Sequence, residues 1–114
     1  MMDVLHQKLG IRKSLGLPEN AKFLDCGCGV GFLCFEAIND GFRAYGFDID
    51  KERIEKFSDL KSKYRDTDIV ASVQNIPFSN DCFDIAYSSH VLEHVPDQEQ
   101  ALNEIWRVLK KNVG

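Results

Sequence analysis

The chain has 114 residues, a formal net charge of −4 at pH 7, 44% apolar residues and 28% charged residues. This length and composition fit one soluble globular domain over residues 1–114. Acidic and basic residues are mixed along the sequence, so nothing indicates nucleic-acid binding, and no apolar run approaches the roughly 20 residues that cross a bilayer. Nothing at the amino terminus has the pattern of an export signal. We therefore expect a cytoplasmic protein with no membrane or nucleic-acid partner.

Strands and helices are predicted to alternate along the chain. Apolar side chains at helical spacing predict a leading helix over residues 2–15, which the turn at residues 16–20 ends. Further helices are predicted from residue 30 to 39, after a cap at Asp50, and after a cap at Asp97. Gly41 is a candidate C-cap. Strands are predicted over residues 21–25, 42–48, 68–73 and 83–87.

The last helix is predicted to be amphipathic, with one apolar face against the core. Trp106 is interpreted as a core residue rather than a stacking platform, and Arg107 is expected to make a surface or helix-end contact. Asp84 lies early in its strand and is interpreted as structural. The inward-facing residues predicted for this helix are Ala101, Leu102, Ile105, Trp106 and Leu109.

Strands that alternate with helices imply parallel pairing and right-handed crossovers. We expect an α/β fold with a Rossmann-like open parallel sheet in the order 3-2-1-4, in a three-layer α/β/α arrangement. Residues 1–20 would form the leading helix and turn, and residues 21–114 the core. The ligand crevice would lie outside the carboxyl end of the first strand, where the strand order reverses.

A glycine-rich turn lies at that position. Residues 25–31 have the pattern D-x-G-x-G-x-G. The dinucleotide pattern G-x-G-x-x-G fails, because its sixth position is Phe32 when counted from Gly27 and Cys34 when counted from Gly29. The Walker phosphate loop fails as well, since no Gly-Lys-Ser/Thr follows the turn. The pattern therefore favours a nucleotide-type ligand that is neither a dinucleotide nor a nucleoside triphosphate.

The acids beside the turn narrow the choice of ligand. Asp25 would repel a pyrophosphate but attract an ammonium or sulfonium. The helix that begins near Val30 offers backbone N–H groups to a carboxylate, and Asp48 can accept two hydrogen bonds from ribose hydroxyls. An amino acid joined to a nucleoside meets all three demands. S-adenosylmethionine is such a molecule.

The four cysteines do not indicate a metal. Cys26 and Cys28 lie in the turn, and no second Cys or His pair completes a usual zinc spacing. We expect no metal site and interpret the thiols as small, partly buried side chains. A reducing compartment fits four free thiols.

Six segments follow one another along the chain: LDCGCGVG at 24–31, GFDID at 46–50, IPF at 76–78, FDIA at 83–86, HVLEHV at 90–95 and EIWRVLK at 104–110. In this order they resemble a class I S-adenosylmethionine-dependent methyltransferase of the small-molecule and quinone type. The resemblance runs from about residue 21 to the end of the chain. It implies a Rossmann-like cofactor domain that uses S-adenosylmethionine and releases S-adenosylhomocysteine.

The resemblance also assigns residues to parts of the cofactor. The turn would hold the methionine part, Asp48 the ribose and Ile49 the adenine, while Val73 would offer its backbone N–H to the ring. Many relatives have an acid where this chain has Ser72, so Ser72 or Gln74 would take the adenine amino group. Ser89 would close the pocket around the methionine. The turn residues assigned in this way are Asp25, Gly27, Cys28, Gly29 and Gly31.

No catalytic residue is assigned. His90 and His94 have the chemistry of a general base, but the segment that contains His94 recurs in relatives with different substrates, which favours a structural role. Methyl transfer from a sulfonium depends mainly on positioning, so a base is needed only if the acceptor must lose a proton. The methyl acceptor is expected to be a small molecule.

Members of this family usually have three more strands after a segment like that at 104–110, and the sequence up to Gly114 contains no counterpart of these strands. The fourth strand would then be an apolar edge, which favours homodimer formation by pairing with a second copy. Two functional hypotheses stay open at this point. The chain is either the cofactor-binding portion of a methyltransferase or a non-catalytic module that binds S-adenosylmethionine or a partner.

Overall fold

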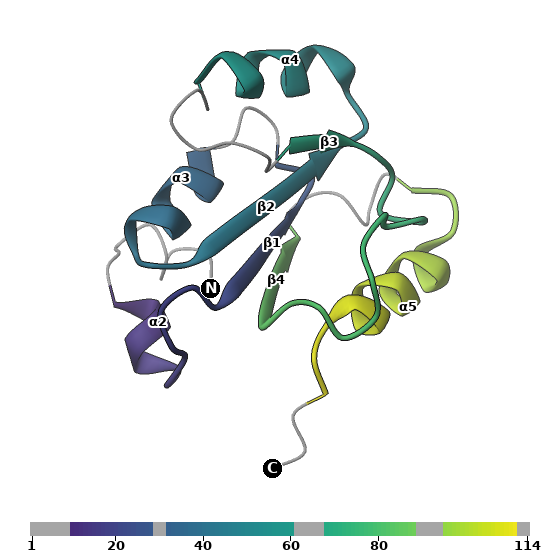
Figure 1. The fold of residues 1–114 in the computed structure, drawn as a ribbon. Helices are drawn as coiled ribbons and strands as arrows, with labels where there is room; N and C mark the ends of the chain where they lie inside the picture. Colours follow the sequence, from purple (N-terminus) through teal and green to yellow (C-terminus); the bar gives the residue numbers. More distant parts are fainter. Residues whose placement is uncertain (1–9, 29–31, 61–67, 89–94, 112–114) are drawn as a thin grey trace.

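The computed structural model describes residues 10–28, 32–60, 68–88 and 95–111. Four parallel strands form one sheet in the order β3-β2-β1-β4, which confirms the predicted order 3-2-1-4 (Figure 1). The bounds of the strands are β1 (Lys22–Cys26), β2 (Arg43–Asp48), β3 (Asp68–Val70) and β4 (Ile85–Ser88).

The described helices cover both faces of the sheet. In Figure 1, α3 lies on one side of the sheet and α5 on the other, which gives the expected α/β/α layers. The helix α4 follows β2 and packs on β2 and β3. The bounds of the helices are α2 (Ile11–Ser14), α3 (Phe32–Asn39), α4 (Lys51–Leu60) and α5 (Gln98–Val108).

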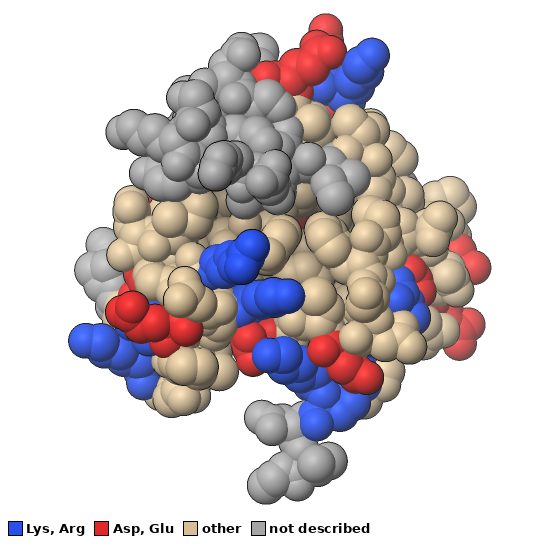
Figure 2. Space-filling model, in the orientation of Figure 1, with Lys and Arg blue, Asp and Glu red and all other residues tan. Residues whose placement is uncertain are grey.

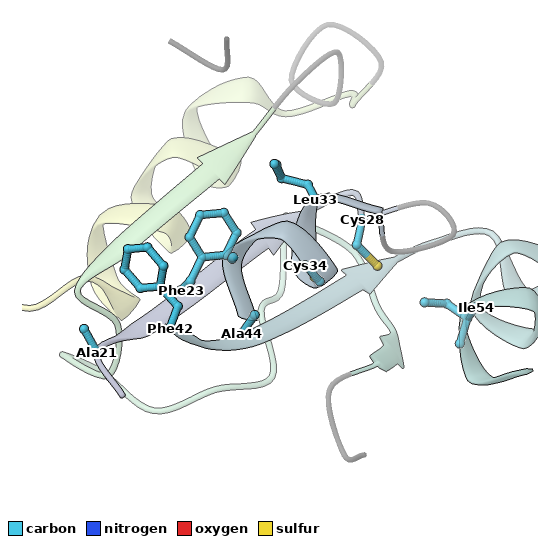
Figure 3. Packing of buried hydrophobic residues seen from close by; sticks show 9 residues of the cluster. Ala21, Phe23, Cys28, Leu33, Cys34, Phe42, Ala44 and Ile54 are labelled. Carbon is cyan, nitrogen blue, oxygen red and sulfur yellow. The ribbon is translucent and has the colours of Figure 1, made fainter. Parts of the chain in front are cut away.

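Two hydrophobic cores flank the sheet because side chains along a strand alternate between its faces. Phe23 of β1 pairs with Ala44 of β2, and both lie in the core beneath α3. The rings of Phe23 and Phe42, which lie side by side in Figure 3, have centroids 5.5 Å apart. Ile54 brings α4 into the same core.

The other face of the sheet packs against α5. Leu24 and Cys26 of β1 lie in this second core and have no exposed surface. Its aromatic members meet edge to face, with ring centroids 5.6 Å apart for Tyr45 and Phe83 and 5.1 Å apart for Phe78 and Phe83. Since these rings come from β2 and from the segment before β4, they fix that segment against the sheet.

The connection from α3 to β2 confirms Gly41 as a C-cap. Gly41 has φ 93°, a left-handed conformation that glycine adopts without a steric penalty. Its N–H donates to Ile38 O at 3.0 Å, and Phe42 N–H donates to Ala37 O at 3.0 Å. This pair of hydrogen bonds is a Schellman motif, which satisfies the last carbonyls of α3.

The leading helix differs from the prediction of one helix over residues 2–15. Gly10 has φ 100° and ends any continuous α-helix at that point, so the described helix begins at Ile11. The carboxylate of Asp40 accepts hydrogen bonds from Gly10 N and Arg12 N, both at 3.0 Å. A side chain distant in sequence therefore caps α2, and the spacing of apolar residues could not reveal it. Residues 1–9 lie outside the described residues.

The predicted buried face of α5 was wrong at two positions. Ala101 and Val108 are fully buried, and Ile105 is partly buried beside them. Leu102 is 53% exposed and Trp106 65% exposed, because both lie beyond the stripe that faces the sheet. Trp106 is therefore a surface residue, with Lys111 Nζ 4.7 Å from its ring centroid. The predicted cap is confirmed, since the Asp97 side chain accepts a hydrogen bond from Gln100 N.

The strands β1 and β2 differ from their predicted bounds by at most one residue at either end, and β3 and β4 differ by more. The strand β3 stops at Val70, because the chain turns at once: Ser72 Oγ accepts a hydrogen bond from Gln74 N at 3.1 Å. The strand β4 begins two residues after Phe83, which instead forms an isolated bridge with Leu109. The hydrogen bond from Lys22 N to Asp84 Oδ2 at 2.8 Å confirms that Asp84 has a structural role.

Charged side chains are interspersed over the surface. On the face shown in Figure 2, Lys and Arg lie beside Asp and Glu rather than in a field of one sign. The ion pairs include Lys110 with Asp84 and Lys111 with Asp81, at 3.2 Å and 3.1 Å between nitrogen and oxygen. Among the residues that the structure describes, no helix is long and apolar enough to cross a membrane.

Candidate cofactor site

The turn after β1 is attached to the end of β2. Gly27 has φ 84°, which explains why a glycine stands there. The N–H groups of Gly27 and Cys28 both donate to the carbonyl oxygen of Phe47, each at 2.8 Å. The carboxyl ends of the two neighbouring strands are therefore held together at the point where a parallel sheet places its ligand.

Gly46 allows the turn to approach β2 closely. A Cβ atom on Gly46 would lie 2.7 Å from Cys28 Cβ, 2.9 Å from Cys28 Sγ and 3.0 Å from Cys34 Sγ. The two distances to Cys28 are shorter than real Cβ contacts and the one to Cys34 is very tight, so a side chain at position 46 would force the turn or the strand to shift. Cys28 and Cys34 are both buried, and Figure 3 shows them beside β2.

Asp25 is a buried acid at the carboxyl end of β1. It is 3% exposed, and burial together with the charge of Asp48 raises the pKa of Asp25 to about 7. Among the described residues no positive charge offsets these two effects. Because burial and the charge of Asp48 both favour the neutral carboxyl, a cationic group that approaches Asp25 would stabilise its anion.

Asp48 lies two residues beyond the partner of Asp25 in the strand register. Asp25 pairs with Gly46, so Asp48 is on the same face of the sheet. Asp48 is 6% exposed, its Oδ1 accepts from Asp50 N at 2.8 Å, and its Oδ2 lies 3.9 Å from Arg53 Nη1. Asp50 caps α4, as predicted, by accepting from Glu52 N at 2.9 Å.

The segment after β3 lies against the same edge of the sheet. Ala71 N–H donates to Asp48 O at 3.0 Å, which places residues 72–74 next to the end of β2. Val73 is 2% exposed, and its side chain belongs to the core beneath α5. Ile49 has the opposite character, since this apolar side chain is 74% exposed directly beside Asp48.

Comparison with known proteins identifies the family. The sequence model of the methyltransferase domain matches residues 24–113, which include both acids and the turn. The chain belongs to the methyltransferase domain family. The cofactor of this family is S-adenosylmethionine. The site fits that cofactor, because a buried acid with a raised pKa, a glycine turn and a second buried acid lie at one edge of the sheet.

Two curated relatives show how the methyltransferase domain is used elsewhere. The chain is 33% identical over 104 residues to sterol 4-C-methyltransferase strm-1 of Caenorhabditis elegans, covering 88% of this chain and 31% of that protein. It is 35% identical over 104 residues to a ubiquinone biosynthesis O-methyltransferase of Pelagibacter ubique, covering 90% of this chain and 43% of that protein. The chain thus spans well under half the length of these relatives.

A solved structure supports the fold. The YcgJ protein from Bacillus subtilis superposes on 93% of this chain and 47% of its own with a TM-score of 0.76 and 26% sequence identity. The methyltransferase domain therefore has the Rossmann-like architecture expected from the sequence, with α3 and α4 on one face of the sheet and α5 on the other.

The structure brings most of the predicted site residues of this methyltransferase domain to one edge. Gly29, Gly31, Ser89, His90 and His94 lie outside the described residues. Sequence reasoning missed the carbonyl of Phe47, which anchors the turn, and the close packing at Gly46. The available sequence signal for this close packing was Gly46 itself, a glycine two residues before the acid that ends the strand. The predicted residues found together at the carboxyl ends of β1, β2 and β3 are Asp25, Gly27, Cys28, Asp48, Ile49, Ser72, Val73 and Gln74.

Proposed function

We propose that this protein binds S-adenosylmethionine at the carboxyl ends of β1 and β2 and transfers its methyl group to a small-molecule acceptor. The observation that carries the proposal is the buried pair of acids. Asp25 is held at a pKa of about 7 by burial and by Asp48. A ligand with an ammonium group and a ribose would stabilise both acids, the first by charge and the second by hydrogen bonds.

The described residues divide the cofactor between them in this proposal. Asp25 holds the ammonium group, and the turn at Gly27 and Cys28 lies against the methionine part. Asp48 accepts hydrogen bonds from the ribose hydroxyls, and the exposed side chain of Ile49 covers the adenine. Residues 72–74 meet the edge of the purine, because the hydrogen bond from Ala71 to Asp48 keeps them beside the ribose position.

Gly29, Gly31 and Ser89 are assigned to the methionine end of the site from the sequence alone. When bound, the cofactor would supply an activated methyl group: the acceptor would bond to the methyl carbon as the C–S bond breaks in line, and the thioether S-adenosylhomocysteine would leave. The part of the protein is to hold the donor in a fixed orientation. We assign no catalytic base, and His90 and His94 are retained as structural residues.

The acceptor is proposed only as a class. The two relatives named above are a C-methyltransferase and an O-methyltransferase, so this cofactor domain is compatible with different acceptor atoms. A small molecule is favoured because charge on the face in Figure 2 is interspersed, without the basic field that a nucleic acid would need. The cytoplasm remains the proposed compartment, because four described cysteines that form no disulfide fit a reducing environment.

The second candidate function is a non-catalytic module that binds S-adenosylmethionine without transferring the methyl group. The described residues that carry the proposal support cofactor binding, which both candidates share. The two candidates differ in one measurement. Transfer of label from methyl-labelled S-adenosylmethionine to a mixture of small-molecule acceptors supports the enzyme, and saturable binding without transfer supports the module.

A homodimer through β4 is also proposed. In the sheet of the described residues, β4 lies at the edge and pairs only with β1. An open edge strand can pair with a second copy. Light scattering at high protein concentration tests this proposal, because a dimer mass supports it and a monomer mass contradicts it.

Calorimetric titration with S-adenosylmethionine and S-adenosylhomocysteine tests the proposed function itself. We expect saturable binding of both compounds to the folded protein, which circular dichroism verifies. Adenosine diphosphate is the matched negative ligand, because its pyrophosphate would be repelled by Asp25. The proposal fails if folded protein gives neither heat nor a thermal shift with either S-adenosyl compound.

A further inference from the structure

Arg107 connects α5 to the loop that follows β3. Its Nη2 donates to Ile76 O at 2.8 Å, and its Nη1 donates to Phe78 O at 2.9 Å and to Asn80 Oδ1 at 2.8 Å. The sequence predicted a surface or helix-end contact for Arg107, which lies in the last turn of α5, but it did not reveal that this contact reaches the loop after β3. The planar guanidinium therefore donates three hydrogen bonds to a segment about 30 residues away in sequence.

Glu104 completes this connection. Its carboxylate accepts from Arg107 Nε at 2.8 Å and from Arg107 Nη2 at 2.9 Å, in a bidentate pair. The same carboxylate accepts from Ile76 N at 2.8 Å. The Glu104 side chain is 12% exposed, and the hydrogen bond from Arg107 is the main cause that lowers the pKa of Glu104. Glu104 is therefore an anion that the pair and Ile76 hold in one orientation.

The loop held in this way begins at the residues assigned to the purine. Asn75 N donates to Ser72 O at 2.9 Å, so residues 72–75 form a closed turn directly before Ile76. The amino-terminal end of α5 holds the same turn, since Gln100 Nε2 donates to Gln74 O at 3.1 Å. The turn is thus fixed to α5 on one side and, through Ala71, to Asp48 on the other.

We propose that Glu104 and Arg107 are positioning residues that make the site selective for adenine, by fixing residues 72–74 against the edge of the purine. The inference rests on the proposed function and deepens it. A backbone segment that contacts a purine edge must be positioned to a fraction of an ångström. Residues 72–75 have backbone hydrogen bonds of their own, and side-chain anchors on α5 fix the segment that follows them. The pair on α5 provides those anchors without touching the ligand.

The test compares two ligands that differ only at position six of the purine, S-adenosylhomocysteine and S-inosylhomocysteine. The quantity measured is the ratio of their dissociation constants. Arg107→Lys keeps the positive charge but cannot donate to Glu104, Ile76 and Phe78 in one plane. We expect Arg107→Lys to weaken S-adenosylhomocysteine binding roughly tenfold, as for one or two lost charge-assisted hydrogen bonds, and to leave S-inosylhomocysteine nearly unchanged. The preference for adenine then falls by a similar factor.

Glu104→Gln is the second variant, in case Arg107→Lys does not fold. Its amide oxygen can still accept from Ile76 N, so we expect a smaller fall in the ratio in the same direction. Asp40→Asn is the matched control, because Asp40 anchors α2 through Gly10 and Arg12, at a distance from the loop after β3 (Figure 1). It should lower the unfolding midpoint without changing the ratio.

The outcomes separate this inference from the proposed function. If the wild-type protein binds neither ligand, the proposed function fails and the inference fails with it. If it prefers S-adenosylhomocysteine and the α5 variants keep that preference, or lose both ligands by equal factors, only the inference is overturned. A lower ratio in Asp40→Asn would also overturn it, because selectivity would then follow stability alone.

Discussion

Asp25 and Asp48 lie on the same face of the sheet at the carboxyl ends of neighbouring strands, and each is less than 10% exposed at 3% and 6%. The charge of Asp48 adds to burial in raising the pKa of Asp25 to about 7. Repulsion between the two buried carboxylates lowers the stability of the folded protein, and a cationic ligand can offset this loss. The first two predictions follow from this relationship.

Asp25→Asn is expected to stabilise the protein at neutral and alkaline pH. The pKa of Asp25 is raised from 3.8 to about 7, so the folded state binds more protons than the unfolded state between these values. Stability of the wild type therefore falls as the pH rises through this window. The variant should gain about 1–3 kcal/mol more over the wild type at pH 8 than at pH 5.

Urea denaturation at the two pH values measures this gain. Asp84→Asn is a control that removes a carboxylate at the opposite end of the sheet, where the acid accepts from Lys22 N and pairs with Lys110. It should not become more stable than the wild type as the pH rises. If the free energy of unfolding of Asp25→Asn depends on pH as that of the wild type does, Asp25 does not destabilise the folded protein when it ionises.

Binding of S-adenosylhomocysteine is expected to strengthen as the pH rises toward 7 and to level off above it. Asp25 must be ionised to hold the ammonium group, and its pKa of about 7 leaves it largely protonated in more acidic solution. The affinity should fall roughly tenfold for each pH unit below 7. Calorimetry from pH 5 to 9 measures the profile, and Asp25→Asn should bind weakly at every pH. A flat wild-type profile would exclude Asp25 from the binding step.

Asp48→Ala is expected to weaken S-adenosylhomocysteine binding by roughly 1–3 kcal/mol, because charge-assisted hydrogen bonds to the ribose are lost. The matched control is Asp50→Asn, two residues along the chain, which removes one charge but keeps an acceptor for Glu52 N. Isothermal titration of both variants measures the difference. If both variants lose the same affinity, the effect comes from net charge, and Asp48 has no special role.

Gly46→Ala is expected to destabilise the protein and to weaken cofactor binding. The new Cβ atom would lie 2.7 Å from Cys28 Cβ, so the turn must move away from β2. Overpacking of this kind costs roughly 1–3 kcal/mol. Thermal unfolding and titration with S-adenosylhomocysteine measure the two effects.

A second substitution at Cys28 checks the cause. Cys28→Gly removes the Cβ atom that Gly46→Ala would meet, so the double variant should lose less stability than the two single losses together. If the stability losses of the two single variants simply add in the double variant, the clash with Cys28 is not what excludes a side chain at position 46.

The sequence by itself determined the topology and the family. Strands of residues such as Phe23 and Leu24, buried on both faces, alternate with helices, and parallel sheets of this kind admit few arrangements. The two acids and the glycine turn were also readable, because backbone freedom and charge are local properties of residues. The same holds for the caps at Gly41, Asp50 and Asp97, which depend on residues within one turn of the helix end.

Only the tertiary structure decided which long-range contacts these residues make. The cap of Asp40 on α2, the exposure of Trp106 and the reach of Arg107 to Ile76 all join segments far apart in sequence. Periodicity shows that a helix has an apolar face, but the width of that face depends on what packs against it. The raised pKa of Asp25 has the same origin, since burial and the approach of Asp48 exist only after the strands have paired.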